Sequence, residues 1–187
     1  IAAFLAAAAL PAFAQLTIAG ESFEGQASVG GSKLLLNGVG LRAVAWLKAY
    51  AAGLYLPRNT QAPQEALQMP GPKRVQIRML LEAPAKEFVK ALDAGVAKNT
   101  SESEFAALRE RLGRLTKAVA DVGTVRKGDV INLDYTPGKG LQFSHNGQSL
   151  GGLIPGEDLY PAVLKIFIGE HPIDKSLKAG LLAGKAG

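Results

Sequence analysis

The sequence predicts an α+β domain in which a large antiparallel sheet carries a helical layer on one face, as in an open-faced β-sandwich. Two observations predict it. Strand-like segments separated by turn residues come first, and helical patterns, a hairpin and two more helices follow them. The length of 187 residues, of which 48% are apolar, is typical of one globular domain. We therefore expect a single domain over residues 15–187.

The first fourteen residues have the form of an export signal. They carry no charge and end in Pro11-Ala12-Phe13-Ala14, an apolar stretch followed by the small residues of a cleavage site. A membrane span needs about 20 apolar residues, so we expect no transmembrane segment here. We expect cleavage before Gln15 and a periplasmic or secreted location. A buried first helix is the alternative.

Strands open the expected domain. Gly30-Gly31 predicts a hairpin turn, and Asn37-Gly38-Val39-Gly40 predicts a second turn. The run Leu41–Leu56 predicts one long extended segment. Farther along the chain, Arg74–Glu82 alternates between polar and apolar residues, which predicts another strand. The proline-rich stretch before it, residues 57–72, predicts either a loop or a short helix at 63–68.

Helices come next. Pro84 to Glu87 has the form of a helix start, and Phe88, Leu92 and Val96 then recur at fourfold spacing on one face. Ser101 to Glu104 matches the capping box S-x-x-E and predicts the start of a second helix. The remaining predicted elements are strands at 129–135 and 141–145, turns at 137–140 and 146–147, and helices at 159–168 and 172–182.

Composition and motifs exclude several functions. The net charge is +5, but basic and acidic residues alternate, as in residues 102–114, so we expect no nucleic-acid binding. The chain has no cysteine, no G-x-S-x-G, no H-E-x-x-H and no P-loop. His145 and His171 are the only histidines, and we interpret both as surface residues. We expect no metal site and no cofactor, and the sequence identifies no catalytic residue.

The segment after the second glycine cluster is the unusual one. If it is extended, Arg42, Val44, Trp46, Lys48 and Tyr50 share one face, which mixes cations with aromatic rings. The cations either extend to the sheet edge and pair with carboxylates, or one of them faces a pocket and binds an anionic ligand. In one straight strand about 26 Å separates Arg42 from Tyr50, so both reach one small ligand only if the strand bends.

Several segments of the sequence resemble the chalcone isomerase superfamily, and in particular its bacterial branch with signal peptides. The resemblance rests on Asn37–Arg42 and Lys48–Leu56, and continues through Lys86–Val89, Phe143-Ser144 and Ile168–Pro172. It implies a large antiparallel sheet, a helical layer on one side, and a ligand cleft between them.

The resemblance implies two kinds of activity. In the plant enzymes an Arg, a Thr, a helical Tyr and Asn, and a last hydroxyl group act in ring closure. Arg42 occupies the Arg position, whereas Tyr50, Phe88, Gly95 and Asp174 occupy the other four. Activity as an isomerase of the intramolecular lyase type is therefore the alternative hypothesis.

The non-catalytic relatives are similar to fatty-acid-binding proteins, in which the same Arg receives a carboxylate. The planar guanidinium suits a carboxylate because the two groups form a bidentate pair. The resemblance thus implies a small apolar acid as ligand, with Arg42 as its anion contact and Tyr50 and Phe88 as further ligand-binding residues. Lys48 joins this predicted set because it shares the strand face of Arg42. Ligand binding predicts a cavity of about 300 Å³ or more near Arg42. A third hypothesis, a structural or partner-binding domain, predicts a cleft filled by side chains.

Overall fold

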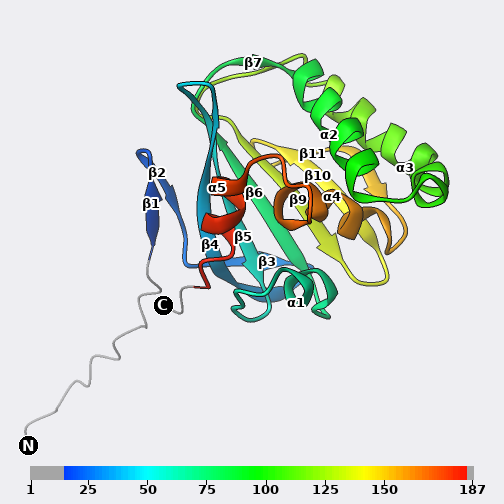
Figure 1. The fold of residues 1–187 in the computed structure, drawn as a ribbon, viewed down its shortest axis with the longest axis horizontal. Helices are drawn as coiled ribbons and strands as arrows, with labels where there is room; N and C mark the ends of the chain where they lie inside the picture. Colours follow the sequence, from blue (N-terminus) through cyan, green and yellow to red (C-terminus); the bar gives the residue numbers. More distant parts are fainter. Residues whose placement is uncertain (1–14, 185–187) are drawn as a thin grey trace, which may run out of the picture.

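The computed structural model describes residues 15–184 and has a seven-stranded antiparallel sheet at its centre (Figure 1). The strand order is β11-β10-β9-β6-β5-β4-β3. The strands are β3 (Gln26–Val29), β4 (Ser32–Val44), β5 (Leu47–Leu56), β6 (Lys73–Met79), β9 (Val130–Thr136), β10 (Gly140–His145) and β11 (Gln148–Ile154). The predicted fold class is confirmed, while the signal-peptide prediction concerns residues outside the described range.

The helices cover one face of this sheet (Figure 1). They are α1 (Pro63–Gln68), α2 (Ala85–Asn99), α3 (Glu102–Ala120), α4 (Leu159–Ile168) and α5 (Lys175–Leu181). Ser101 caps α3 as predicted. Its hydroxyl accepts a hydrogen bond from the backbone amide of Glu104, and the carboxylate of Glu104 accepts one from the backbone amide of Ser101. Helix α5 begins later than predicted, since the carboxylate of Asp174 caps it by accepting from the Leu177 amide at 2.9 Å.

The two faces of the sheet bury two separate apolar clusters. On the helix side, alternate residues of β5, β6, β9 and β10 pack against α2, α3 and α4. On the other side lies a smaller cluster made of Phe23, Val29, Leu34, Leu36, Ala51 and Tyr55. Phe23 belongs to the small hairpin of β1 (Leu16–Ile18) and β2 (Glu21–Phe23). The sheet curls around this second cluster, which brings Gly30 against the side chain of Thr136.

The predicted turn at Asn37–Gly40 is wrong, because these residues lie inside β4. Asn37 is the extra residue of a bulge, between Leu36 and Gly38 in the register with β5. Its buried amide donates to the carbonyl of Leu181 at 2.8 Å, and its oxygen accepts from the Thr60 amide at 2.7 Å. The glycines serve the packing of α5 across β4 (Figure 1). A Cβ on Gly38 or Gly40 would collide with the α5 backbone.

The prediction of one extended segment from Leu41 to Leu56 is also wrong. A two-residue turn at Ala45-Trp46 divides it into the end of β4 and the whole of β5, with Val44 opposite Leu47. Ala45 has a φ of 53°, in the left-handed region, and no glycine or asparagine announces this turn in the sequence. The hairpin makes Arg42 and Tyr50 direct cross-strand partners, so the distance of an extended chain does not apply.

Two further features complete the fold. Strand β11 was not predicted; it follows the Asn146-Gly147 turn and contains two glycines with positive φ.

At the same turn, His145 is half-buried and lies 2.8 Å from the carboxylate of Asp129. Burial opposes ionisation of Asp129, but hydrogen bonds from Asn146, the Arg126 amide and His145 lower its pKa to about 2.

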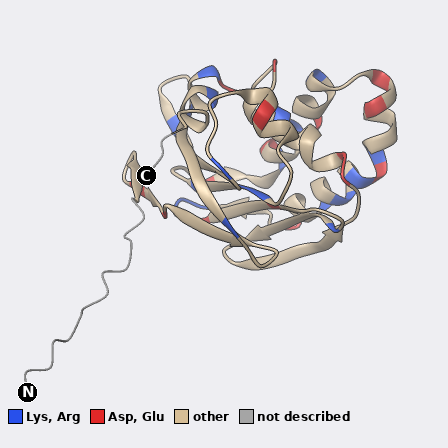
Figure 2. Ribbon diagram, turned by 90° about the horizontal axis from the view of Figure 1, so that it is seen from below, with Lys and Arg blue, Asp and Glu red and all other residues tan. Residues whose placement is uncertain are grey.

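Basic and acidic residues are mixed along the helices. Figure 2 shows Lys and Arg interspersed with Asp and Glu along the helices.

Over residues 15–184, no helix combines the length and the apolar character needed to cross a membrane.

Candidate ligand-binding site

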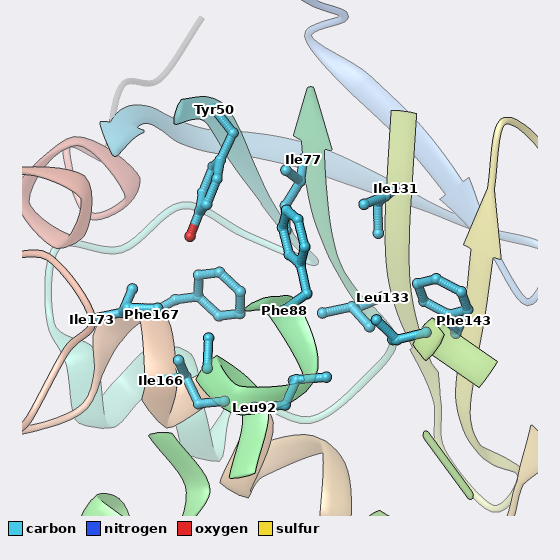
Figure 3. Close-up of a pocket in the computed structure, with 12 residues that line it drawn as sticks. Tyr50, Ile77, Phe88, Leu92, Ile131, Leu133, Phe143, Ile166, Phe167 and Ile173 are labelled. Atoms are coloured by element: carbon cyan, nitrogen blue, oxygen red, sulfur yellow. The ribbon is translucent and has the colours of Figure 1, made fainter. Parts of the chain in front are cut away.

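An apolar pocket lies between the sheet and the helices (Figure 3). Its lining residues are Tyr50, Ile77, Phe88, Ala91, Leu92, Val119, Ile131, Leu133, Phe143, Ile166, Phe167 and Ile173. They come from β5, β6, β9 and β10 on one side and from α2, α3, α4 and the segment before α5 on the other. Tyr50 is the only member with a polar side-chain atom, so this pocket is suited to hydrocarbon and not to a polar molecule.

Aromatic side chains occupy the end of the pocket near β5. Phe88 projects from the first turn of α2, and its ring centroid is 6.4 Å from that of Tyr50. Phe167 projects from the last turn of α4 toward the same region, and the hydroxyl group of Tyr50 points inward above it (Figure 3). The pocket is thus apolar throughout its depth and ends in one phenol.

Arg42 lies beside this phenol. As its cross-strand partner on β4, Arg42 points to the same face of the sheet as Tyr50. Its guanidinium is half-buried and donates one hydrogen bond, 2.8 Å long, to the carbonyl of Ile173, a pocket residue. Within residues 15–184 no Asp or Glu forms an ion pair with Arg42, although six other cations of that region pair with carboxylates.

The ionisation of Tyr50 reflects its position. Burial raises the pKa of its phenol well above the usual value, the Arg42 cation opposes this, and Asp174 adds to it. The phenol is therefore neutral at physiological pH and keeps its proton for donation. Beside a permanently charged guanidinium, it forms a short row of donors at one end of an apolar space.

The structure brings together three of the four residues predicted for ligand binding. Tyr50 and Phe88 line the pocket, and Arg42 stands at its polar end. Lys48 does not join them: it is exposed and lines a separate surface hollow with Trp46. Sequence reasoning missed Phe167 and Ile173. For Phe167 a signal was present, since α4 is apolar except for Lys165 and is therefore expected to be buried over most of its surface.

The cavity is smaller than ligand binding alone predicts. Its volume is about 50 Å³, against the expected 300 Å³ or more, because Phe88, Phe167 and Ile166 fill the space. Gly95 is one reason for this closure. A Cβ at Gly95 would come within 3 Å of Ile166, so glycine at this position lets α4 pack tightly against α2.

Comparison with known proteins identifies the family. A sequence profile described as chalcone isomerase-like matches residues 14–183, which is nearly the whole chain. The chain belongs to the chalcone isomerase-like family. No curated protein sequence matches it.

Among solved structures, the chain is similar to a fatty-acid binding protein of Arabidopsis thaliana. The TM-score is 0.71 at 19% sequence identity, and the match covers 90% of this chain and 96% of that one. At this identity the likeness shows the fold. It agrees with the family assignment, and with a sheet and helical layer of the chalcone isomerase-like type.

Proposed function

We propose that this chalcone isomerase-like domain binds a small apolar carboxylic acid, such as a fatty acid, between its sheet and its helices. One observation carries the proposal: a guanidinium without a carboxylate partner in residues 15–184 stands at the one polar end of an apolar pocket. The likeness to a fatty-acid binding protein supports it. The apolar leader at residues 1–14 supports action after export, in the periplasm or outside the cell.

The polar end suits a carboxylate. A guanidinium has five N–H donors, and within the described part of the chain that of Arg42 donates one hydrogen bond, to the carbonyl of Ile173. The remaining donors can form a charge-assisted pair with an incoming carboxylate. The phenol of Tyr50, kept protonated by burial, can donate a further hydrogen bond. Arg42 and Tyr50 are thus the proposed anion contacts, and Phe88 is a proposed contact of the alkyl chain.

Binding requires the pocket to open. A cavity of about 50 Å³ has room for water-sized molecules and not for an alkyl chain. The rings of Phe88 and Phe167 are the natural parts to move, because each lies at an end of its helix. Rotation of these rings toward the surface would let an alkyl chain take their place among the aliphatic residues. Affinity is then reduced by the cost of this rearrangement.

The proposal is tested by removing the charge of Arg42. In Arg42→Met the affinity for decanoate should fall by about 2–5 kcal/mol, the usual cost of deleting one partner of a buried charged pair. The folding free energy should change by only about 1 kcal/mol, since within residues 15–184 no carboxylate pairs with the guanidinium and none would be left buried and uncompensated. Isothermal titration calorimetry and thermal melts measure the two quantities.

Two controls make this test specific. Lys48→Met removes an exposed cation of the neighbouring strand and should leave decanoate binding unchanged. Methyl decanoate lacks the anion, so wild type should bind it as weakly as Arg42→Met binds decanoate. Equal decanoate affinity in wild type and Arg42→Met would show that Arg42 does not contact the ligand.

A second candidate function has its own support. The small cavity and the tight α2–α4 packing at Gly95 favour a filled cleft, as in a structural or partner-binding domain. Wild-type protein that binds neither decanoate nor longer acids would favour this candidate. The isomerase hypothesis has less support, because Phe88 and Gly95 bring no proton-transferring group to the pocket.

A further inference from the structure

The tip of the β4–β5 hairpin carries an exposed group of apolar side chains. Trp46 is 88% exposed, Val44 53% and Leu47 49%, although a strand hairpin usually turns such residues inward. Across residues 15–184 only one other large apolar residue, Leu153 on β11, is so exposed. The apolar exposure is therefore gathered at one protruding point of the molecule.

Trp46 lies in the turn itself. Ala45-Trp46 is a two-residue turn, and the positive φ of Ala45 is a conformation that an alanine adopts unfavourably. Glycine would adopt it without that cost. The chain thus combines a strained turn with a fully presented indole.

Cations surround this tip more than carboxylates do. Lys48 and Lys127 line the hollow beside Trp46 and Leu47, and the neighbouring Arg126 is exposed. Of the carboxylates nearby, Glu21 also lines the hollow but lies 3.9 Å from Arg78, and Glu82 follows the lining residue Leu81.

We propose that the tip formed by Val44, Trp46 and Leu47 docks on the surface of a bilayer that contains anionic lipids. Tryptophan and leucine beside lysine are the side chains that settle at the boundary between headgroups and acyl chains. A protein partner fits less well, since a stable protein interface buries about 1,000 Å² or more and this tip offers three side chains. A lipid surface requires only that these side chains insert.

The docking would place the ligand pocket near the lipid. Trp46 and Tyr50 lie on the same hairpin, four residues apart, which is about 13 Å along a strand. An acyl chain leaving the bilayer would meet the end of the pocket that Arg42 and Tyr50 form. Docking itself depends on the tip and not on ligand binding, so the two proposals can fail separately.

The single tryptophan of the chain makes the test direct, because all indole fluorescence comes from Trp46. Vesicles of phosphatidylcholine and phosphatidylglycerol should shift its emission to shorter wavelength, and brominated lipids should quench it. Pure phosphatidylcholine vesicles should act more weakly, as should anionic vesicles at high salt. Arg42→Met should retain the full shift.

Variants separate docking from general adhesion. Val44→Ser combined with Leu47→Ser keeps the reporter and should weaken partitioning to anionic vesicles at least tenfold. Leu153→Ser, a matched change at the other exposed leucine, should leave partitioning unchanged. An emission spectrum that vesicles do not alter overturns the proposal. So does a blue shift that appears without lipid as protein concentration rises, since a second copy would then cover the tip.

Discussion

The two ends of the β4–β5 hairpin show opposite arrangements of the same pair of strands. At the inner end, α5 lies across Gly38 and Gly40, and the side chain of Asn37 bonds to both α5 and the loop at Thr60. Among the described residues, no helix crosses the strands at the outer end (Figure 1). There Arg42 donates to the carbonyl of Ile173, and the tip beyond it is exposed.

The two ends of the hairpin differ in how much substitution they tolerate. The inner end uses residues without side chains and a buried amide whose partners are all within the protein, so it is fixed by packing. At the outer end, within residues 15–184, Arg42 forms no ion pair and donates to the carbonyl of Ile173, and Trp46 is largely exposed. We infer that stability resides at the inner end and ligand recognition at the outer end.

The largest expected effect comes from breaking the inner end. Gly40→Ala places a Cβ against the backbone of Leu177, so α5 must move away from β4. We expect a loss of about 3 kcal/mol or more of folding free energy, at the upper end of the range for overpacking, measured by urea unfolding. Gly113→Ala is the control: it lies in α3 with open space around it and should gain up to about 1 kcal/mol. If Gly40→Ala is as stable as wild type, α5 is not held as described.

A smaller effect, the loss of folding stability at alkaline pH, tests whether water is excluded from the outer end. Burial raises the pKa of Tyr50, and it raises the pKa of Tyr55, farther along β5, to about 12. Unfolded tyrosines ionise near pH 10. Folding stability should therefore be fully present below about pH 10 and fall as the pH rises above it, because the unfolded chain releases protons that the folded chain keeps.

Tyr50→Phe should reduce this alkaline loss of stability, measured by urea unfolding at about pH 9 and about pH 11. Tyr55→Phe is the matched change in the second apolar cluster and should reduce it too. If only Tyr55→Phe has an effect, water reaches Tyr50 and the outer end is open rather than sealed.

Local signals explain which elements could be predicted. Helix α2 was predicted from the fourfold spacing of its apolar residues and α3 from its capping box, and both signals lie within short stretches of sequence. The Asn37–Gly40 stretch was misinterpreted because its glycines are required by the close packing of α5, which lies about 140 residues later in the chain. The turn at Ala45 was missed because tertiary pairing imposes a backbone that its own residues disfavour.

The candidate site could be predicted in part for the same reason. Arg42, Tyr50 and Phe88 were found through family resemblance, and the hairpin turn then brought Arg42 and Tyr50 together. The closure of the cleft could not be predicted, since it depends on Gly95 admitting Ile166 from another helix. Lys48 was placed with them only because the segment was taken as one straight strand.

The smallest change in folding free energy is expected at the two turns on either side of β4. Each has two residues: Gly30-Gly31, with positive φ at both, joins β3 to β4, and Ala45-Trp46 joins β4 to β5. Gly31→Ala has open space around its Cβ but keeps the left-handed backbone, so it should lose about 1 kcal/mol. Ala45→Gly should have the opposite sign and gain about 0.5 kcal/mol, because relief of the left-handed alanine exceeds the added entropy of the unfolded chain. Urea unfolding of both variants measures the pair. Two losses would mean that the outer turn is not strained, and that its alanine is retained for packing alone.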